Sequence, residues 1–143
     1  MELNMISTGI ELIGSTIKNL IINNSIVDIE MDGKRNFSIN INEPEFEKSD
    51  DQYFAQLLID FEIEIMQNEN QECSIELSVE GAFLSKSNID IEEFKKLVIV
   101  NGAAALIGIA RGKIEAITAN IFNNGKIVIP FVNVIDYYKS LNE

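Results

Sequence analysis

The chain has 143 residues and a net charge of −12, with 46% hydrophobic residues and 2 prolines. This length is typical of a single domain, and the apolar fraction is too high for a disordered tail. The negative charge disfavours nucleic acid as a partner, because neutralising phosphates requires clustered Lys and Arg. We therefore expect one domain over residues 1–143, with residues 1–14 as a loosely ordered N-terminal segment.

The cysteine count and the N-terminus indicate the compartment. Cys73 is the single cysteine of the sequence, so no intrachain disulfide forms, which favours a reducing environment. The N-terminus carries Glu2 and Glu11 without a positively charged region, unlike a signal peptide. A cytoplasmic location is predicted.

The first two thirds of the chain alternate between apolar and polar residues, as strands with one buried face do. Residues 43–52 interrupt this pattern and are predicted to form a loop, because Pro44 cannot donate to a strand ladder. The predicted strands cover residues 26–31, which end at the turn pair Asp32-Gly33, and residues 36–42, 57–67 and 72–83.

The third and fourth predicted strands have an apolar inner face and an acidic outer face. Cys73 lies on the inner face, where a buried structural thiol is the expected state. The inner face is predicted to hold Ile59, Phe61, Ile63, Ile65, Cys73, Ile75, Leu77 and Val79, and the outer face Asp60, Glu62, Glu64, Glu76 and Glu80.

The last third of the chain has helical periodicity. Asp90 followed by Glu93 predicts a helix start, and residues 91–122 are expected to be helical up to the sequence Asn-Asn-Gly at 123–125. Glycine in the pair at 101–102 predicts a break or bend, since it costs roughly 1 kcal/mol inside a helix.

A short extended piece and a final helix are predicted after residue 125. The extended piece covers residues 126–130, and an amphipathic helix covers residues 134–142. The fold class is therefore α+β: a four-stranded antiparallel sheet with a long helix and a C-terminal helix packed on one side.

The long helix contains the least polar part of the chain, a run of fourteen uncharged residues at 97–110. A membrane span needs about 20 apolar residues. The run is shorter, and Lys95, Lys96, Arg111 and Lys113 close its two ends. We expect no membrane insertion, which leaves a core helix or a helix packed against another subunit.

Small residues recur every four positions on this helix, at Ala104, Gly108 and Gly112. Such a stripe allows another helix to approach closely. Large apolar residues such as Ile109 and Ile117 extend around much of the helix, which then needs more than one packing partner. The sequence therefore predicts that the stripe is an oligomer interface.

Residues with catalytic or metal-binding chemistry are sparse. The sequence has no histidine, and the segment GIARGKI lacks the glycine spacing of a phosphate-binding loop. The outer carboxylates are explained by a solvated sheet face. We therefore predict no catalytic site, no cofactor and no metal; a thioesterase of the hot-dog type remains a distant alternative.

The order and spacing of several segments resemble the SecB family of export chaperones over residues 15–141. These segments are TIKNLIINN as the first strand, SIELSVEGAF as the fourth strand, ARGKI inside the long helix, and IVIPFVNVIDYY before and within the last helix. The resemblance implies a four-stranded antiparallel sheet with helices on one side, and tetramers in which the long helices pack between dimers.

The resemblance also implies holding of unfolded polypeptides without ATP, in hydrophobic grooves. For Ile127 and Ile129 a place in the core is at least as well supported by general burial statistics. The candidate groove residues are Phe37, Phe46, Tyr53, Phe54, Phe83, Leu84, Ile127, Ile129, Phe131 and Tyr137.

Members of the family dock the motor protein SecA on an acidic sheet surface, and Glu62, Glu64 and Glu76 are the candidate residues here. Asn19 and Asn23 stand where the first strand of the family is usually acidic, and the chain ends without the family's longer C-terminal tail. We therefore expect weak or no SecA binding. A chaperone dedicated to a toxin–antitoxin partner, or an adaptor with one fixed partner, is the alternative.

Overall fold

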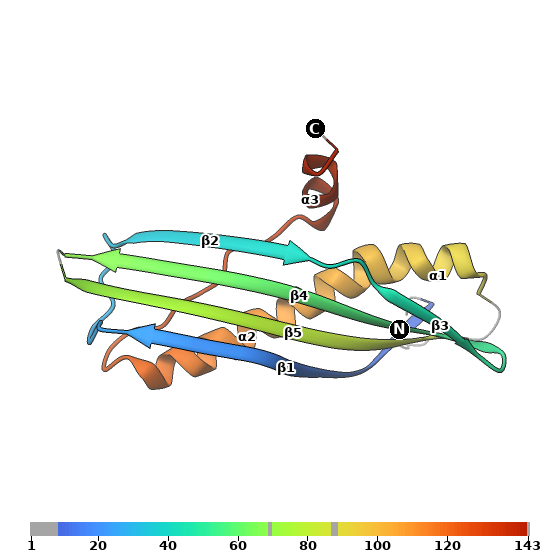
Figure 1. The fold of residues 1–143 in the computed structure, drawn as a ribbon, viewed down its shortest axis with the longest axis horizontal. Coiled ribbons are helices and arrows are strands. Elements are labelled where there is room, and N and C mark those ends of the chain that lie inside the picture. Colours follow the sequence, from blue (N-terminus) through green and yellow to red (C-terminus); the bar gives the residue numbers. More distant parts are fainter. Residues whose placement is uncertain (1–8, 69, 87–88, 143) are drawn as a thin grey trace, which may run out of the picture.

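The computed structural model describes residues 9–68, 70–86 and 89–142. The sheet is antiparallel, with the order β1-β5-β4-β2 and with β3 beside β4 (Figure 1). Its strands are β1 (Ile10–Asn24), β2 (Lys34–Ile41), β3 (Glu45–Ser49), β4 (Gln52–Gln67) and β5 (Gln71–Ser85). The predicted α+β class with an antiparallel sheet is confirmed.

The sheet has five strands instead of four because its outer edge is divided. β2 and β3 lie end to end along β4: β2 ends opposite Ile59, and β3 begins opposite Gln56. Pro44 lies in the break, where it has no N–H to give to the ladder. The loop predicted for residues 43–52 is therefore wrong, since the chain continues as β3 and returns through Asp50, which adopts a φ of 53°.

The strand predicted at residues 26–31 is also wrong. These residues form a loop in which Ile26 is buried and Met31 is 98% exposed, so the apolar alternation does not describe a strand face. The loop lies against the segment after the long helix: the Ile29 N–H donates to the Asn124 carbonyl over 3.0 Å. The turn at 31–33 is present, but it does not join two paired strands.

The first strand of the fold is β1, as the SecB resemblance implied, and it pairs with β5. It begins at Ile10. Residues 10–14 therefore belong to a strand, whereas the sequence analysis expected a loosely ordered segment there. Residues 1–8 lie outside the described part of the chain. β1 is an edge strand, and its pairing shifts register after Leu12 and after Ile17.

The inner face of β4 and β5 is the centre of the core. The alternation predicted for these strands is confirmed, and every one of its inner residues is at most 3% exposed. Together with Ala55, Leu57 and Phe83, the buried side chains are Ile59, Phe61, Ile63, Ile65, Cys73, Ile75, Leu77 and Val79.

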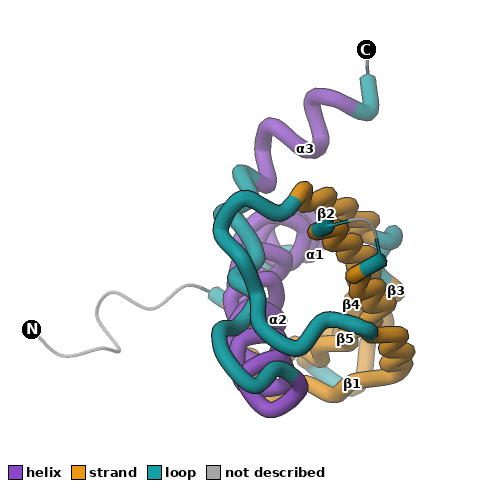
Figure 2. Tube along the Cα trace, turned by 90° about the vertical axis from the view of Figure 1, so that its left-hand side faces the viewer, coloured by secondary structure: helices purple, strands orange, loops and turns teal. Residues whose placement is uncertain are grey.

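One continuous helix covers this face (Figure 2). It consists of α1 (Ile91–Leu97), a wide π-helical turn η2 (Val98–Gly102) and α2 (Ala103–Ile121). The predicted cap is confirmed, because the Asp90 carboxylate accepts from the Glu93 N–H at 2.9 Å. The predicted irregularity takes the form of the π turn. Gly102 is packed so closely that an added Cβ would lie 3.1 Å from the Phe83 ring.

The chain then returns across the inner face as an extended segment, residues 126–132, which we call the strap. Ile127 and Ile129 of the strap are buried. α3 (Val134–Ser140) follows, started by the Asn133 side chain, which accepts from the Asp136 N–H. The final helix is thus present, but it projects beyond the β2 edge instead of lying flat on the sheet (Figures 1 and 2).

The strap depends on one buried hydroxyl of α2. Thr118 Oγ1 accepts from the Ile127 N–H at 2.8 Å and donates to the Ile114 carbonyl at 2.7 Å. In the variant Thr118→Val, the buried Ile127 N–H loses its acceptor, and we expect the free energy of unfolding to fall by about 1–3 kcal/mol. Urea denaturation measures the loss.

The control is Asn120→Ala, which removes an exposed amide bonded to the Ala116 carbonyl. We expect a change within about 0.5 kcal/mol. Equal losses for the two variants would show that the hydrogen bond from the Ile127 N–H to Thr118 contributes no more to stability than an exposed hydrogen bond.

Candidate functional site

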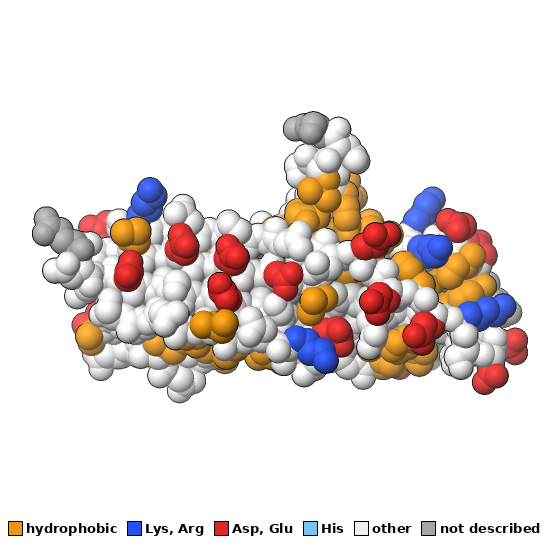
Figure 3. All heavy atoms as spheres, viewed as in Figure 1, with side chains coloured by type: hydrophobic (Ala, Val, Ile, Leu, Met, Phe, Trp, Pro, Cys, Tyr) orange, Lys and Arg blue, Asp and Glu red, His pale blue; other side chains and the backbone are white. Residues whose placement is uncertain are grey.

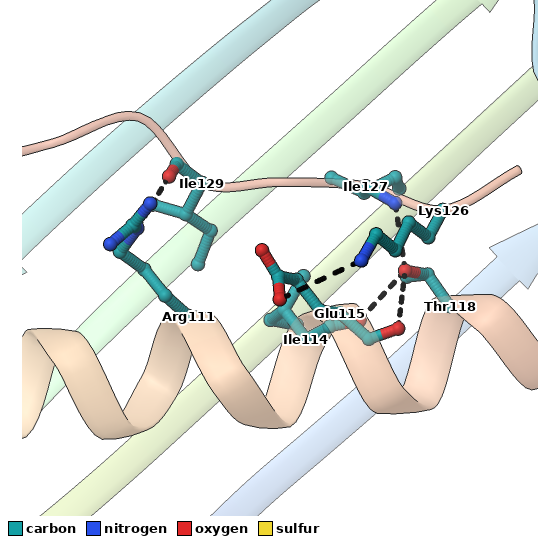
Figure 4. A network of polar contacts seen from close by, with 7 residues as sticks. All are labelled: Arg111, Ile114, Glu115, Thr118, Lys126, Ile127 and Ile129. Atoms are coloured by element: carbon teal, nitrogen blue, oxygen red, sulfur yellow. Dashed lines mark hydrogen bonds and ion pairs between the residues drawn. The ribbon is translucent and has the colours of Figure 1, made fainter.

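The strap is held beside α2 by three polar contacts (Figure 4). In addition to the Thr118 bond, Arg111 Nε donates to the Ile129 carbonyl at 2.8 Å. Lys126 and Glu115 form an ion pair at 3.9 Å, which is partly exposed and therefore weak. The Ile127 N–H and the Ile129 carbonyl of the strap are thus paired with side chains of α2. The side chains of the strap face the sheet or the solvent.

Among the described residues, Phe131 is the most exposed aromatic side chain, with 87% of its surface accessible. The Arg111 guanidinium lies 4.0 Å from the centroid of the ring. A guanidinium over an aromatic face is attracted by the electron density of the ring. Arg111 therefore holds both the backbone of the strap and the orientation of its exposed aromatic residue.

An apolar cleft of about 100 Å³ separates the strap from β2. It is large enough for one small apolar group. Its lining comes from β2, β4 and the strap: Phe37, Ser38, Ile39, Phe61, Glu62, Ile63, Ile129, Pro130 and Val132.

Two of the predicted groove residues, Phe37 and Ile129, line this cleft. Tyr137 lies at the end of β2, where its hydroxyl accepts from the Ile41 N–H at 3.0 Å. Phe83 and Ile127 are buried in the core of the subunit and present no surface in this conformation.

Phe46 and Tyr53 lie elsewhere, in an aromatic cluster between the β3–β4 hairpin and α1. Both rings contact the buried Phe94, with centroid distances of 6.0 Å and 5.9 Å. Lys95 lies 5.5 Å from the centre of the Phe46 ring, and Lys48 lies 5.8 Å from that of Tyr53. None of these rings lines the cleft beside the strap, so the cluster is a separate place.

Phe54 and Leu84 are paired across β4 and β5 on the outer face of the sheet. The ten predicted groove residues therefore do not form one continuous surface. The sequence analysis did not include Phe94 or the other residues that line the cleft, such as Ile39 and Val132, among its candidates. The spacing of Ile91, Phe94 and Val98 on the capped helix could have indicated that Phe94 is buried.

The outer face of the sheet carries the predicted acidic residues (Figure 3). Glu62, Glu64 and Glu76 are exposed, and Glu62 lies directly opposite Glu76 across the β4–β5 ladder. Glu80 lies 3.8 Å from Lys18. An open hollow of about 400 Å³ adjoins the face and is lined by polar residues such as Asn23, Glu64 and Glu72 and by apolar ones such as Ile65 and Met66.

Asp60 differs from its acidic neighbours because it is hydrogen-bonded. Partial burial works to raise its pKa, but hydrogen bonds from Ser78, Asn42 and Asn40 outweigh burial and hold the pKa below its ordinary value. Asp60 therefore belongs to the scaffold at the end of β2 and is less available to a partner than Glu62.

Burial raises the pKa of the Cys73 thiol. The thiol form predominates at neutral pH, which is unfavourable for nucleophilic chemistry. Cys73 is a buried free cysteine, as expected from the sequence.

The small-residue stripe of α2 faces away from the sheet. Ala104, Gly108 and Gly112 are exposed, and no atom lies within 4 Å of a Cβ built on either glycine. Ile109 and Ile117, expected to need a second partner, are half-buried within the subunit. The stripe is therefore accessible, and its role as an oligomer interface stays a prediction.

The continuous helix Ile91–Ile121 is long and apolar enough, by length and composition only, to cross a membrane. The fourteen-residue run is thus part of the 31-residue helix that the sequence predicted over residues 91–122. Its most apolar window is 39% buried inside the subunit, and core helices of soluble proteins meet the same criterion, so this is weak evidence. The absence of membrane insertion stays a prediction.

No family model and no curated protein match the sequence. A similar solved structure is the SecB-like chaperone Rv1957 of Mycobacterium tuberculosis in complex with a ChAD peptide from the Rv1956 HigA1 antitoxin. Its TM-score is 0.56 at 9% identity, over 86% of this chain and 90% of that chain. This chain has a SecB-like fold.

A second similar solved structure is that of a protein of unknown function from Streptococcus agalactiae. The TM-score is 0.53 at 13% identity, over 85% of this chain and 97% of that chain. At these identities the likeness concerns the fold. The predicted SecB-like fold, with its combination of antiparallel sheet, long helix and short C-terminal helix, is confirmed.

The charge arrangement of the outer face makes a stability prediction. Like charges directly opposite each other on a sheet are destabilising, so neutralising one of them in Glu76→Gln should raise the free energy of unfolding by about 0.2–1 kcal/mol at low salt. Added salt should reduce the gain by screening. Urea denaturation at two salt concentrations measures it.

Glu45→Gln is the matched control, since Glu45 lies on the same face opposite the uncharged Gln56. We expect little change for it. A gain at Glu76 that is insensitive to salt would contradict repulsion between Glu62 and Glu76.

Proposed function

We propose that this protein is an ATP-independent chaperone that holds non-native polypeptides at the apolar cleft between β2 and the strap. The observation that carries the proposal is an apolar cleft next to Phe131, a highly exposed ring held in place by Arg111. Exposed apolar surface of this kind marks a binding site. The SecB-like fold supports the proposal, as does a structural neighbour that was captured with a bound peptide.

A dedicated chaperone is the second candidate. The peptide bound to the Mycobacterium tuberculosis neighbour comes from an antitoxin. We therefore propose a toxin–antitoxin protein as a partner alongside general clients, with SecA binding weak or absent because Asn19 and Asn23 replace acidic residues. The protein is proposed to act in the cytoplasm, without enzymatic activity. A thioesterase would instead show acyl-thioester turnover that depends on a carboxylate such as Glu115.

The holding function makes a direct prediction. The protein should suppress aggregation of an unrelated, chemically unfolded protein without nucleotide and at near-stoichiometric ratios, because a holder does not turn over. Phe131→Ser should weaken suppression, since it removes exposed apolar surface at the cleft without disturbing the core. Light scattering measures aggregation, and circular dichroism verifies the fold.

The matched control is Met31→Ser, which removes a 98% exposed apolar side chain from the β1–β2 loop. It should leave suppression unchanged. Equal effects of the two variants would show that holding does not depend on the cleft. A folded wild-type protein without affinity for unfolded chains would overturn the proposed function.

We also propose that the α2 stripe joins subunits into dimers or tetramers. Sedimentation should then show an oligomer, and Gly108→Leu should dissociate it by steric block. A Cβ at Gly108 meets no atom within 4 Å, so the new side chain begins in open space on the outside of the subunit. Phe131→Ser, which changes the other side of the strap, should keep the oligomer. A monomeric wild-type protein would contradict the interface.

A further inference from the structure

β2 presents an open edge on the side away from β4. Among the described residues, no strand pairs with that side of β2. The Asn42 N–H donates inward to the Leu58 carbonyl, whereas the Ile41 N–H donates outward to Tyr137. Backbone groups of a strand alternate in direction, so the N–H and C=O groups of Phe37 and Ile39 also point outward.

Tyr137 closes one end of this edge. Its hydroxyl accepts the hydrogen bond of the Ile41 N–H at 3.0 Å. In an added strand, a backbone carbonyl would accept that bond instead. Tyr137 comes from α3, which projects past the edge (Figure 1). The open part of the edge is therefore the segment around Phe37 and Ile39, and Tyr137 marks its limit.

The inner side of the edge is apolar. Phe37 and Ile39 line the cleft under β2 together with Ile129 and Val132 of the strap. In a strand added to β2, every second side chain would point to the inner face. The cleft has room for one apolar side chain of such a strand.

The outer side of the edge is polar and faces negative charge. Asn36 and Ser38 of β2 are uncharged and lie opposite Glu64 and Glu62 of β4. A strand added to β2 would lie roughly 9–10 Å from β4, given about 4.8 Å between neighbouring strands. A lysine on its outer face spans much of that distance and approaches the two carboxylates within about one Debye length.

We propose that β2 takes up an extended peptide as an additional strand, with apolar side chains on the inner face and basic side chains on the outer face, and that Tyr137 competes for the end of this strand. The proposal rests on the proposed function and names how the client is recognised. Backbone pairing would account for binding of many sequences, since every extended chain offers the same donors and acceptors.

The test uses a peptide of about seven residues that alternates valine with lysine, a typical strand length. Two derivatives carry N-methyl groups, one on the valines and one on the lysines. In a strand only one of these sets of N–H groups faces β2. Fluorescence anisotropy should therefore show that one derivative loses binding and the other retains it. Equal effects of the two methylations would overturn the proposal.

Two further measurements test the remaining parts. The peptide should slow hydrogen exchange of the Phe37 and Ile39 amides, and unchanged exchange with bound peptide would overturn the pairing. Tyr137→Phe should raise the affinity about fivefold, the worth of one neutral hydrogen bond, because the Ile41 N–H becomes available. An unchanged or lower affinity would show that Tyr137 does not compete.

The charge requirement is tested by a peptide that alternates valine with glutamate, which should not bind. Binding as tight as that of the lysine peptide would refute the proposed occupant. If the wild-type protein suppresses aggregation but binds both methylated peptides equally, the holding function stands and strand addition at β2 is refuted. If it binds neither the peptides nor unfolded protein, both proposals are refuted.

Discussion

A single helix is too narrow to cover the inner face of this sheet. Four strands across span about 19 Å at roughly 4.8 Å per strand, whereas a helix with its side chains is about 10–12 Å wide. α2 packs mainly on β4 and β5, and the cleft on the inner side of β2 is lined by the strap and not by α2. The strap is the element that crosses this remaining width, and its buried backbone is satisfied by Thr118 and Arg111 of α2.

The cleft follows from the shape of the strap. An extended segment places alternate side chains on opposite sides, so Ile127 and Ile129 enter the core while Val128 stays exposed. The alternation changes phase at Pro130, so Phe131 is exposed and Val132 lines the cleft. Phe37 and Ile39 on the inner side of β2 are therefore only half-buried. The edge of β2 to which no described strand pairs borders the same cleft. Apolar contact and backbone pairing are the two features that the proposed extended client would use there.

The remaining surfaces face in other directions and have different chemistry. The outer sheet face is acidic, with Glu62 and Glu76 opposed at some cost in stability. Such charge favours solubility of a protein with exposed apolar groups. The small-residue stripe of α2 lies on the side of the helix away from the sheet. A client, a basic partner and another subunit would thus meet the SecB-like fold on separate surfaces.

The sequence was sufficient to predict the elements that depend on residues close together in the chain. The alternation of β4 and β5, the cap at Asp90 and the irregular turn at Gly102 each depend on neighbouring residues, and each is present. The acidic outer face follows from the same alternation. The order of segments was also sufficient for the SecB resemblance.

Tertiary contacts decided the rest. Residues 26–31 alternate like a strand but pair with the segment at Asn124, which lies far away in the sequence. β3 forms because β4 is long enough to pair beyond Pro44. The walls of the cleft come from β2, β4 and the strap, and the Tyr137 hydroxyl meets β2 across 96 positions of the chain. No local pattern records such contacts, because the chain must first form the sheet, cover it with a helix and return over the uncovered width.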